Sequence, residues 1–328
     1  MNVTFQELKA QFEKVLVKHG FSEERAELCA RIFAENSRDG VYSHGLNRFP
    51  VFVQLVAKGM VAVQAEPECI GRNGVLETWD GHRAPGMYTA TLAMQRAIAL
   101  AKENGIGGVA VKDTNHWMRG GTYGWQAADA GCIGICATNA IANMPPHGGA
   151  EPRLGNNPLV IAVPRKGRGH LVLDMAMSQF SYGKLQEYEL KGEQLPVAGG
   201  YDKDGRLSMD PASIRASERA LPIGFWKGSG LSLMLDVLVA SLSGGRSVAN
   251  ITADGMEAGV SQLFLCINAE HLEESIIENI LAYTRSSQPV EGGGKVLYPG
   301  ERTLLTRRRN EQEGIPVNEM IWQQVLAL

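Results

Sequence analysis

Short apolar runs that alternate with helical patterns restrict the fold of this chain more than any other feature of its sequence. Four runs have the length and the small or β-branched residues of buried strands, namely 108–112, 134–138, 159–163 and 170–174. Apolar residues recur at helical spacing in the segments 87–103, 121–130 and 231–242, and the last of these is predicted to be a buried helix. Because strands that alternate with helices are typical of α/β domains, we predict an α/β fold.

A change of pattern along the chain predicts three regions. Residues 1–72 form a helical region, with capping residues at Thr4 and Ser22 and a third helix expected at 43–59. Residues 73–250 form the α/β region. Residues 251–328 contain one more strand and two helices, and we expect this segment to pack back on the other two regions.

Composition excludes several classes of protein. The 32 Lys and Arg against 35 Asp and Glu give a net charge of −3, which argues against a nucleic-acid partner because phosphate backbones select basic surfaces. No apolar run reaches the ~18 residues that a membrane span needs, and the N-terminus lacks a signal-peptide pattern. The five cysteines are scattered and odd in number, so we expect reduced thiols, no bound metal and a cytoplasmic location.

One glycine motif resembles a dinucleotide-binding loop but stands in the wrong context. Residues 105–110 read Gly-Ile-Gly-Gly-Val-Ala, which matches G-x-G-x-x-A. The Rossmann fingerprint requires a strand before the glycines and a helix after them, so that pyrophosphate meets a helix N-terminus. Here a helix precedes the motif and a strand follows it. We therefore predict a helix-to-strand turn.

The segment 43–50, Ser-His-Gly-Leu-Asn-Arg-Phe-Pro, contains the first candidate for catalysis. His44 and Arg48 are four residues apart and would share one face of a helical turn. The guanidinium disfavours the charged form of the imidazole. This pair suits a site in which Arg48 holds a carboxylate and His44 exchanges a proton with a neighbouring oxygen. A solvated helix start capped by Ser43 remains the alternative.

Two further segments place polar residues where strands end. His116 and Arg119 follow the strand at 108–112, a position where α/β sheets often contact ligands, although an ordinary loop around a buried Trp117 is equally compatible. Asp174 ends the strand at 170–174. It could orient a histidine or bind ribose hydroxyls, or it could cap the next helix.

Lys227 precedes the apolar helical segment 231–242. A cation is unfavourable at a helix N-terminus, because the macrodipole places positive charge there. A bound phosphate would accept hydrogen bonds from the helix N–H groups and from Lys227 together. A solvated lysine is the alternative.

Three of these stretches carry a resemblance to a known family, the type-2 malate/L-lactate dehydrogenases. They are the segments 43–50, 115–125 (Asn-His-Trp-Met-Arg-Gly-Gly-Thr-Tyr-Gly-Trp) and 221–230 (Leu-Pro-Ile-Gly-Phe-Trp-Lys-Gly-Ser-Gly). Within the family the chain looks most similar to the 2,3-diketo-L-gulonate reductases. The resemblance implies a homodimer, with a mixed β-sheet sandwiched by helices in a non-Rossmann nicotinamide-dependent fold.

The resemblance also implies roles for individual residues. His44 would donate the proton. Beyond the resemblance, we expect Ser43 or Asp174 to orient the His44 ring and Arg48, His116 and Arg119 to bind substrate. The positions that match the family's cofactor site are His170, Leu171, Val172, Leu173, Asp174, Met175, Ala176, Trp226, Lys227, Gly300, Glu301 and Arg302.

The expected reaction is NADH-dependent reduction of the C2 carbonyl of a 2-oxo sugar acid, with NADH preferred over NADPH. A malate/L-lactate-type 2-hydroxy acid dehydrogenase is the first alternative. A hydrolase or lyase using His44 and Asp174 is disfavoured by the absence of a G-x-S-x-G elbow or a metal-ligand cluster. A non-catalytic sugar-acid binding protein is disfavoured by the missing export signal.

Overall fold

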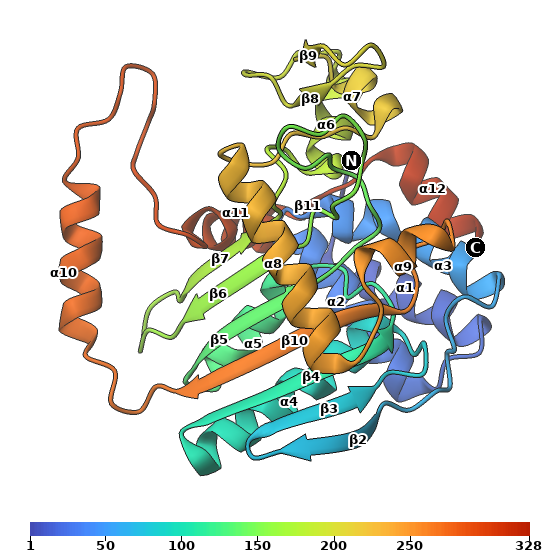
Figure 1. Ribbon diagram of the computed structural model, residues 1–328, viewed down its shortest axis with the longest axis vertical. Helices are drawn as coiled ribbons and strands as arrows, with labels where there is room; N and C mark the ends of the chain where they lie inside the picture. The colour runs from blue at the N-terminus through green and yellow to red at the C-terminus, as the bar shows by residue number, and fades with distance from the viewer.

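The computed structural model describes residues 1–328 and is built around a seven-stranded sheet between two helical layers (Figure 1). The strand order is β2 (Glu68–Asn73), β3 (Leu76–Asp80), β4 (Ile106–Thr114), β10 (Val260–Asn268), β5 (Cys132–Thr138), β6 (Leu159–Val163) and β7 (Leu171–Met175). Only the β3–β4 pair is parallel, and the other neighbouring pairs are antiparallel. The predicted α/β fold with a mixed sheet is confirmed.

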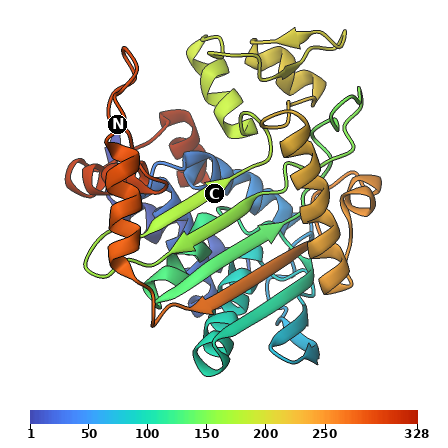
Figure 2. The ribbon, with the colours of Figure 1, turned by 60° about the vertical axis from the view of Figure 1, so that its left-hand side comes forward.

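Helices cover both faces of the sheet. On one face lie α4 (Gly86–Asn104) and α5 (Gly121–Asp129), and α8 (Trp226–Ser243) crosses the other (Figure 2). The alanines of α4 allow close approach to the strands, and Trp117, Tyr123 and Phe264 fill the layer beneath α4 and α5. Burial of these aromatic side chains supplies much of the apolar stabilisation of this layer.

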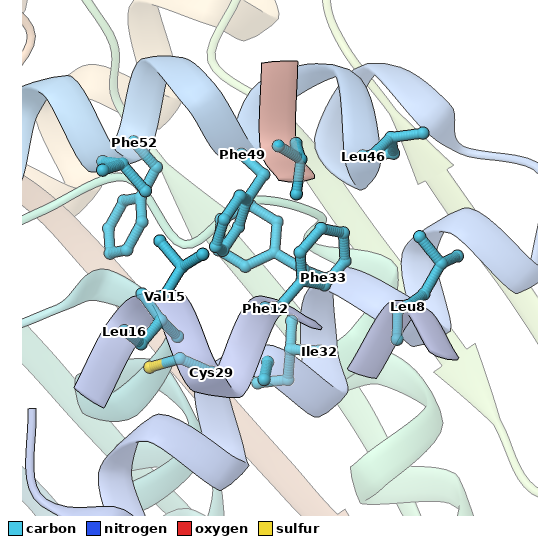
Figure 3. Packing of buried hydrophobic residues seen from close by; sticks show 14 of the residues in the cluster. Leu8, Phe12, Val15, Leu16, Cys29, Ile32, Phe33, Leu46, Phe49 and Phe52 are labelled. Atoms are coloured by element: carbon cyan, nitrogen blue, oxygen red, sulfur yellow. The ribbon is translucent and has the colours of Figure 1, made fainter. Parts of the chain in front are cut away.

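The N-terminal helices form a second core. Side chains of α1 (Phe5–Lys18), α2 (Glu23–Arg38) and α3 (Phe49–Ala57) face one another in Figure 3, where the ring of Phe12 stacks on Phe49 at 4.2 Å. The C-terminus completes this core, because β11 (Ile315–Pro316) pairs with β1 (Asn2–Val3) and α12 (Glu319–Ala327) contributes Trp322 and Val325. The two ends of the chain therefore belong to the core on which the segment that carries His44 and Arg48 packs.

The helix predicted at 43–59 is wrong in its first part. Residues Tyr42–His44 and Leu46–Arg48 form two 3-10 turns, and α3 begins only at Phe49. The break lies at Gly45, where an added Cβ would be 2.2 Å from Ser37 Oγ, while that hydroxyl accepts a hydrogen bond from the Leu46 N–H at 2.9 Å. This close approach to α2 is possible only for glycine.

The prediction of a buried helix at 231–242 holds for one face only. Leu235 and Val239 of α8 pack on the sheet, but the opposite face exposes the large apolar residues Leu231, Leu233, Met234, Val237, Leu238 and Leu242. A second element, α10 (Glu274–Arg285), stands apart from the sheet in Figure 1, and only Leu281 on it is buried.

The segment between β7 and α8 forms a small separate layer at the top of Figure 1. It contains α6 (Tyr182–Lys191), β8 (Gly200–Tyr201), β9 (Leu207–Ser208) and α7 (Pro211–Ser217). Its own core is three buried residues, Leu185, Leu195 and Ile214. The remaining helices are α9 (Val248–Ala253) and α11 (Glu301–Glu313).

Several smaller expectations can also be compared with the structure. Gly105, with φ +84°, joins α4 to β4, so the predicted helix-to-strand turn is confirmed. None of the helices combines the length and apolar character that crossing a bilayer requires. No three His, Cys, Asp or Glu side chains are grouped so that they could hold a metal ion. The division of the chain at residues 72 and 250 stays a prediction.

Candidate active site

A cavity of about 700 Å³ opens between the N-terminal helices, the end of β7 and the α6–α7 layer. Its lining collects residues predicted from four separate stretches: Ser43, His44, Arg48, His116, Arg119, Val172, Leu173, Asp174, Ala176 and Gly300. The volume lies in the usual range for a small-molecule site.

His44 is held by its neighbour in the chain. The Ser43 hydroxyl lies 3.0 Å from His44 Nδ1, and the His44 carbonyl accepts a hydrogen bond from Asn36 Nδ2 at 2.9 Å. Removal from water, together with the nearby His116, Arg48 and Arg119, lowers the pKa of His44 to about 3. The ring is therefore neutral at neutral pH, and its Nε2 atom is free of protein partners.

Arg48 lines the same cavity without a counter-ion. No carboxylate lies within 4.0 Å of its guanidinium, although its charge acts on His44, His116 and Glu257. A half-buried guanidinium with free donors is suited to bidentate binding of a carboxylate. His44 and Arg48 share the cavity even though the helix assumed for their spacing is broken between them.

His116 stacks beside His44, with ring centroids 5.7 Å apart and planes 19° from parallel. The Met118 N–H donates to His116 Nδ1 at 2.9 Å, so the proton of the neutral ring is on Nε2. Burial and the charge of Arg48 lower the pKa of His116 to about 3. The cavity therefore presents two neutral imidazoles next to one free cation.

Arg119 differs from Arg48 because its charge is already paired. Its Nη1 donates to Asp39 at 2.8 Å, and Arg307 binds the same carboxylate through two hydrogen bonds of 2.8 and 2.7 Å. Burial opposes the charge of Asp39, but the hydrogen bonds from Arg307 and the charge of Arg119 outweigh it and lower the pKa of Asp39. A direct substrate contact by Arg119 stays a prediction.

Asp174 is placed at the start of α5 rather than against His44. Its Oδ2 accepts the Gly121 N–H at 2.9 Å and lies 3.5 Å from Arg119 Nε. Of the two residues predicted to orient His44, Ser43 contacts the ring, whereas Asp174 makes no hydrogen bond to it. The alternative that Asp174 caps the next helix is wrong, since Ser181 caps α6 and Asp174 instead accepts an N–H at the start of the earlier helix α5.

The far end of the cavity joins two of the predicted cofactor segments. The Val172 N–H donates to Pro299 O at 3.0 Å, and Gly300 approaches β7 so closely that an added Cβ would be 3.1 Å from Val172 N. Here β7 is the last strand of the sheet, and α11 begins with no side chain capping its N–H groups. An edge strand and an open helix N-terminus both offer donors to a dinucleotide.

The other predicted cofactor residues lie outside the cavity lining: His170, Leu171, Met175, Trp226, Lys227, Glu301 and Arg302. His170 is held by Arg165 N and Asp129, and Glu301 accepts from Tyr298 N and pairs with Arg285. Trp226 and Lys227, in the first turn of α8, have exposed side chains. Cofactor contacts by this set stay predictions.

Sequence reasoning missed several residues of the cavity. Tyr182, Gly183 and Gln186 come from α6, and Glu257 comes from the loop between α9 and β10. Gly183 packs on the segment that carries His44, because an added Cβ would be 2.4 Å from Ser43 Cβ. No local pattern distinguishes these residues from surface polar residues, since only the tertiary fold brings them to the cavity.

The chain is similar to known dehydrogenases over its whole length. The model of a family described as malate/L-lactate dehydrogenase matches residues 3–326. The 2,3-diketo-L-gulonate reductase of Escherichia coli O6:K15:H31 (strain 536 / UPEC) is 44% identical over 334 aligned residues, covering 100% of both chains.

Two solved structures show the same fold. Malate dehydrogenase from Entamoeba histolytica superposes with a TM-score of 0.93 at 26% identity, covering 99% of this chain and 96% of that chain. Sulfolactate dehydrogenase from Methanocaldococcus jannaschii has a TM-score of 0.88 at 29% identity, with 100% and 98% covered.

Proposed function

Since the chain belongs to the malate/L-lactate dehydrogenase family and is an oxidoreductase acting on a CH–OH group, we propose that it reduces the C2 carbonyl of a 2-oxo sugar acid. The reaction is conversion of 2,3-diketo-L-gulonate to 3-keto-L-gulonate. It is supported by 44% sequence identity, over the full length of both chains, to a reductase named for that substrate. The observation that carries the proposal is the meeting of a neutral imidazole and an unpaired guanidinium in one cavity.

Arg48 binds the C1 carboxylate of the substrate in this proposal. The guanidinium forms no ion pair within the protein, so its N–H donors are available to a bound carboxylate. Binding at Arg48 fixes the C2 carbonyl near His44, on the same wall of the cavity. Holding the reacting group in place in this way reduces the entropic part of the barrier.

His44 supplies the proton. A carboxylate bound at Arg48 offsets one of the cations that depress the pKa of the ring, so substrate binding promotes protonation of His44. The proton moves from Nε2 to the C2 oxygen as that oxygen gains charge, while Ser43 keeps Nδ1 oriented. The carbonyl carbon gains a hydride in the same reaction, so the product is an alcohol.

The β7–α11 end of the cavity suits a nicotinamide dinucleotide, which when bound supplies the hydride. Val172, Leu173, Asp174, Ala176 and Gly300 line this end. The edge of β7 outside its contact with Pro299 and the uncapped N-terminus of α11 would provide backbone groups for the cofactor's polar parts. NADH in preference to NADPH is part of the proposal and rests on the resemblance alone.

A homodimer is the proposed assembly. The exposed face of α8 includes Leu233, Met234 and Val237, each about half exposed, and α10 exposes Ile280 and Tyr283. Contiguous apolar surface of this kind usually marks a protein–protein interface. Light scattering should give twice the chain mass of 35.5 kDa, and Val237→Glu should shift the protein to a single chain. A single-chain mass for the parent protein would contradict this assembly.

The deciding experiment measures NADH and NADPH oxidation with 2,3-diketo-L-gulonate, oxaloacetate and pyruvate. The parent protein should prefer the sugar acid with NADH, and preference for oxaloacetate or pyruvate would favour the malate/L-lactate alternative.

A mutation tests the role of His44. His44→Ala should reduce turnover by about 10²–10⁴-fold and still bind NADH, whereas His271→Ala, an exposed control, should leave both turnover and NADH binding unchanged. Near-parent turnover in His44→Ala would rule out its role as the acid.

A further inference from the structure

Glu257 is an acidic residue in the cavity that the catalytic steps above do not use. It lies between α9 and β10, and its side chain is 21% exposed. Its Oε1 is 3.6 Å from His116 Nε2, and its Oε2 accepts the Ile141 N–H at 3.4 Å. No arginine or lysine lies within ion-pair distance, so no permanent cation neutralises this carboxyl group.

Glu257 is the last member of a polar row along the cavity wall. The row runs from Ser43 through His44 and His116 to Glu257, by the contacts already given. Because Met118 N–H occupies His116 Nδ1, the Nε2 proton of His116 faces Glu257. The end of the row therefore offers an imidazole donor and the Oε1 atom of Glu257 to a ligand, since Oε2 already accepts the Ile141 N–H.

Two groups near this row lack a protein side chain of permanent opposite charge within ion-pair distance. Arg48 is a cation whose charge acts on both imidazoles and on Glu257, and Glu257 is the acid beside His116. Burial raises the pKa of Glu257, and the charge of Arg48 and the Ile141 N–H oppose this change. In the pose of the proposed function, a ligand whose carboxylate binds Arg48 and whose next carbon reaches His44 would place its remaining carbons beside His116 and Glu257.

We propose that Glu257 and His116 select the substrate tail: they bind hydroxyl groups and exclude a second carboxylate. A carboxylate oxygen accepts a hydrogen bond from a hydroxyl, and the His116 Nε2–H can donate to the hydroxyl oxygen. A second substrate carboxylate would instead face Glu257, and like charges brought together at a site oppose binding. This inference rests on the proposed function and narrows its substrates to monocarboxylic 2-oxo acids with a hydroxylated tail.

The test compares three 2-oxo acids at about pH 8, well above the ordinary pKa of a carboxyl group. Glu257→Gln keeps the shape and removes the charge, so kcat/KM for oxaloacetate should rise about tenfold or more, while that for pyruvate should not change. Glu257→Ala should lower kcat/KM for 2,3-diketo-L-gulonate about 10- to 100-fold. Glu151→Gln, on an exposed pair with Arg153, is the matched control. Equal changes for all three acids would overturn the proposal.

A binding measurement separates this inference from the proposed reaction. Calorimetry with gluconate, malate and lactate reports tail selection without turnover. The parent should bind gluconate more tightly than malate, and Glu257→Gln should shift that ratio toward malate about tenfold or more. His116→Asn provides a second variant, which should weaken gluconate without improving malate. An unchanged ratio in both variants refutes tail selection, whether or not any 2-oxo acid is reduced.

Discussion

Two arginines line the same cavity in opposite electrostatic settings. Arg119 is 5% exposed and shares Asp39 with Arg307, so its charge is compensated within the protein. Arg48 has no counter-ion, and two imidazoles with pKa values depressed to about 3 lie beside it. The first arrangement holds α2, the 115–121 loop and α11 together, and the second leaves a cation available to a ligand.

This contrast separates residues that maintain the fold from residues that act on substrate. An uncompensated charge in a partly buried site costs stability, and functional sites commonly retain such charges because binding requires them. Removing a member of the Asp39 cluster, which consists of Asp39, Arg119 and Arg307, should therefore lower stability, whereas removing Arg48 should lower activity.

The largest effect is expected for Asp39→Asn. This change removes the carboxylate that Arg119 and Arg307 share and leaves the buried Arg119 with only its longer contact to Asp174, so the free energy of unfolding should fall by about 3 kcal/mol. Urea unfolding followed by circular dichroism measures this loss. Glu151→Gln, which removes an exposed ion pair, should leave the midpoint unchanged. If Asp39→Asn unfolds like the parent, the cluster does not hold these elements together.

Arg48→Ala should separate activity from stability. Loss of the carboxylate partner should reduce kcat/KM for 2-oxo acids by about 10²–10³-fold, mainly through KM, equivalent to about 3–4 kcal/mol. The unfolding midpoint should stay the same or rise, since an uncompensated cation is removed. Steady-state kinetics and thermal melting of the same sample test both parts. A loss of stability with KM unchanged would reverse the assignment of the two arginines.

Gly183→Ala tests how tightly the α6 layer holds the catalytic segment. The added Cβ would be 2.4 Å from Ser43 Cβ, so either α6 or Ser43 must shift, and a shift of Ser43 would disturb its contact with His44. We expect kcat to fall about tenfold with KM little changed. Gly71→Ala, whose Cβ would have no neighbour closer than 3.9 Å, serves as the control. Parent-like kcat in Gly183→Ala would show that the layer yields without disturbing His44.

The smallest effect concerns pH. His44 and His116 have folded-state pKa values of about 3, below the ~6.5 of an unfolded histidine, so the unfolded chain binds more protons between these values. Stability should therefore decline as pH falls below ~6.5, by on the order of 1 kcal/mol per histidine near pH 5.5. Unfolding of the parent and of His44→Asn/His116→Asn across this range measures the slope. An identical slope in both proteins would contradict the depressed pKa values.

Most of the secondary structure could be read from the sequence. The capping residues Thr4 and Ser22 accept the expected hydrogen bonds, and the four predicted strand runs lie within or overlap β4, β5, β6 and β7. The break at Gly45 was not predictable, since it follows from contact with Ser37 of α2. The half-exposed face of α8 was missed for a similar reason, because apolar composition alone does not show which faces are covered.

The candidate site, like the fold, has features that follow from the sequence and features that only the tertiary structure determines. The sequence by itself determined which chemical groups are available, because residue type and position along the chain mark His44, Arg48, His116, Arg119 and Asp174 as candidates. Only the tertiary structure decided which of them are free to act: Asp39 neutralises Arg119 across 80 residues of chain, and Arg307 joins the same cluster across 268. Charge pairing depends on the distance between two groups in space, and a local sequence pattern does not contain that distance.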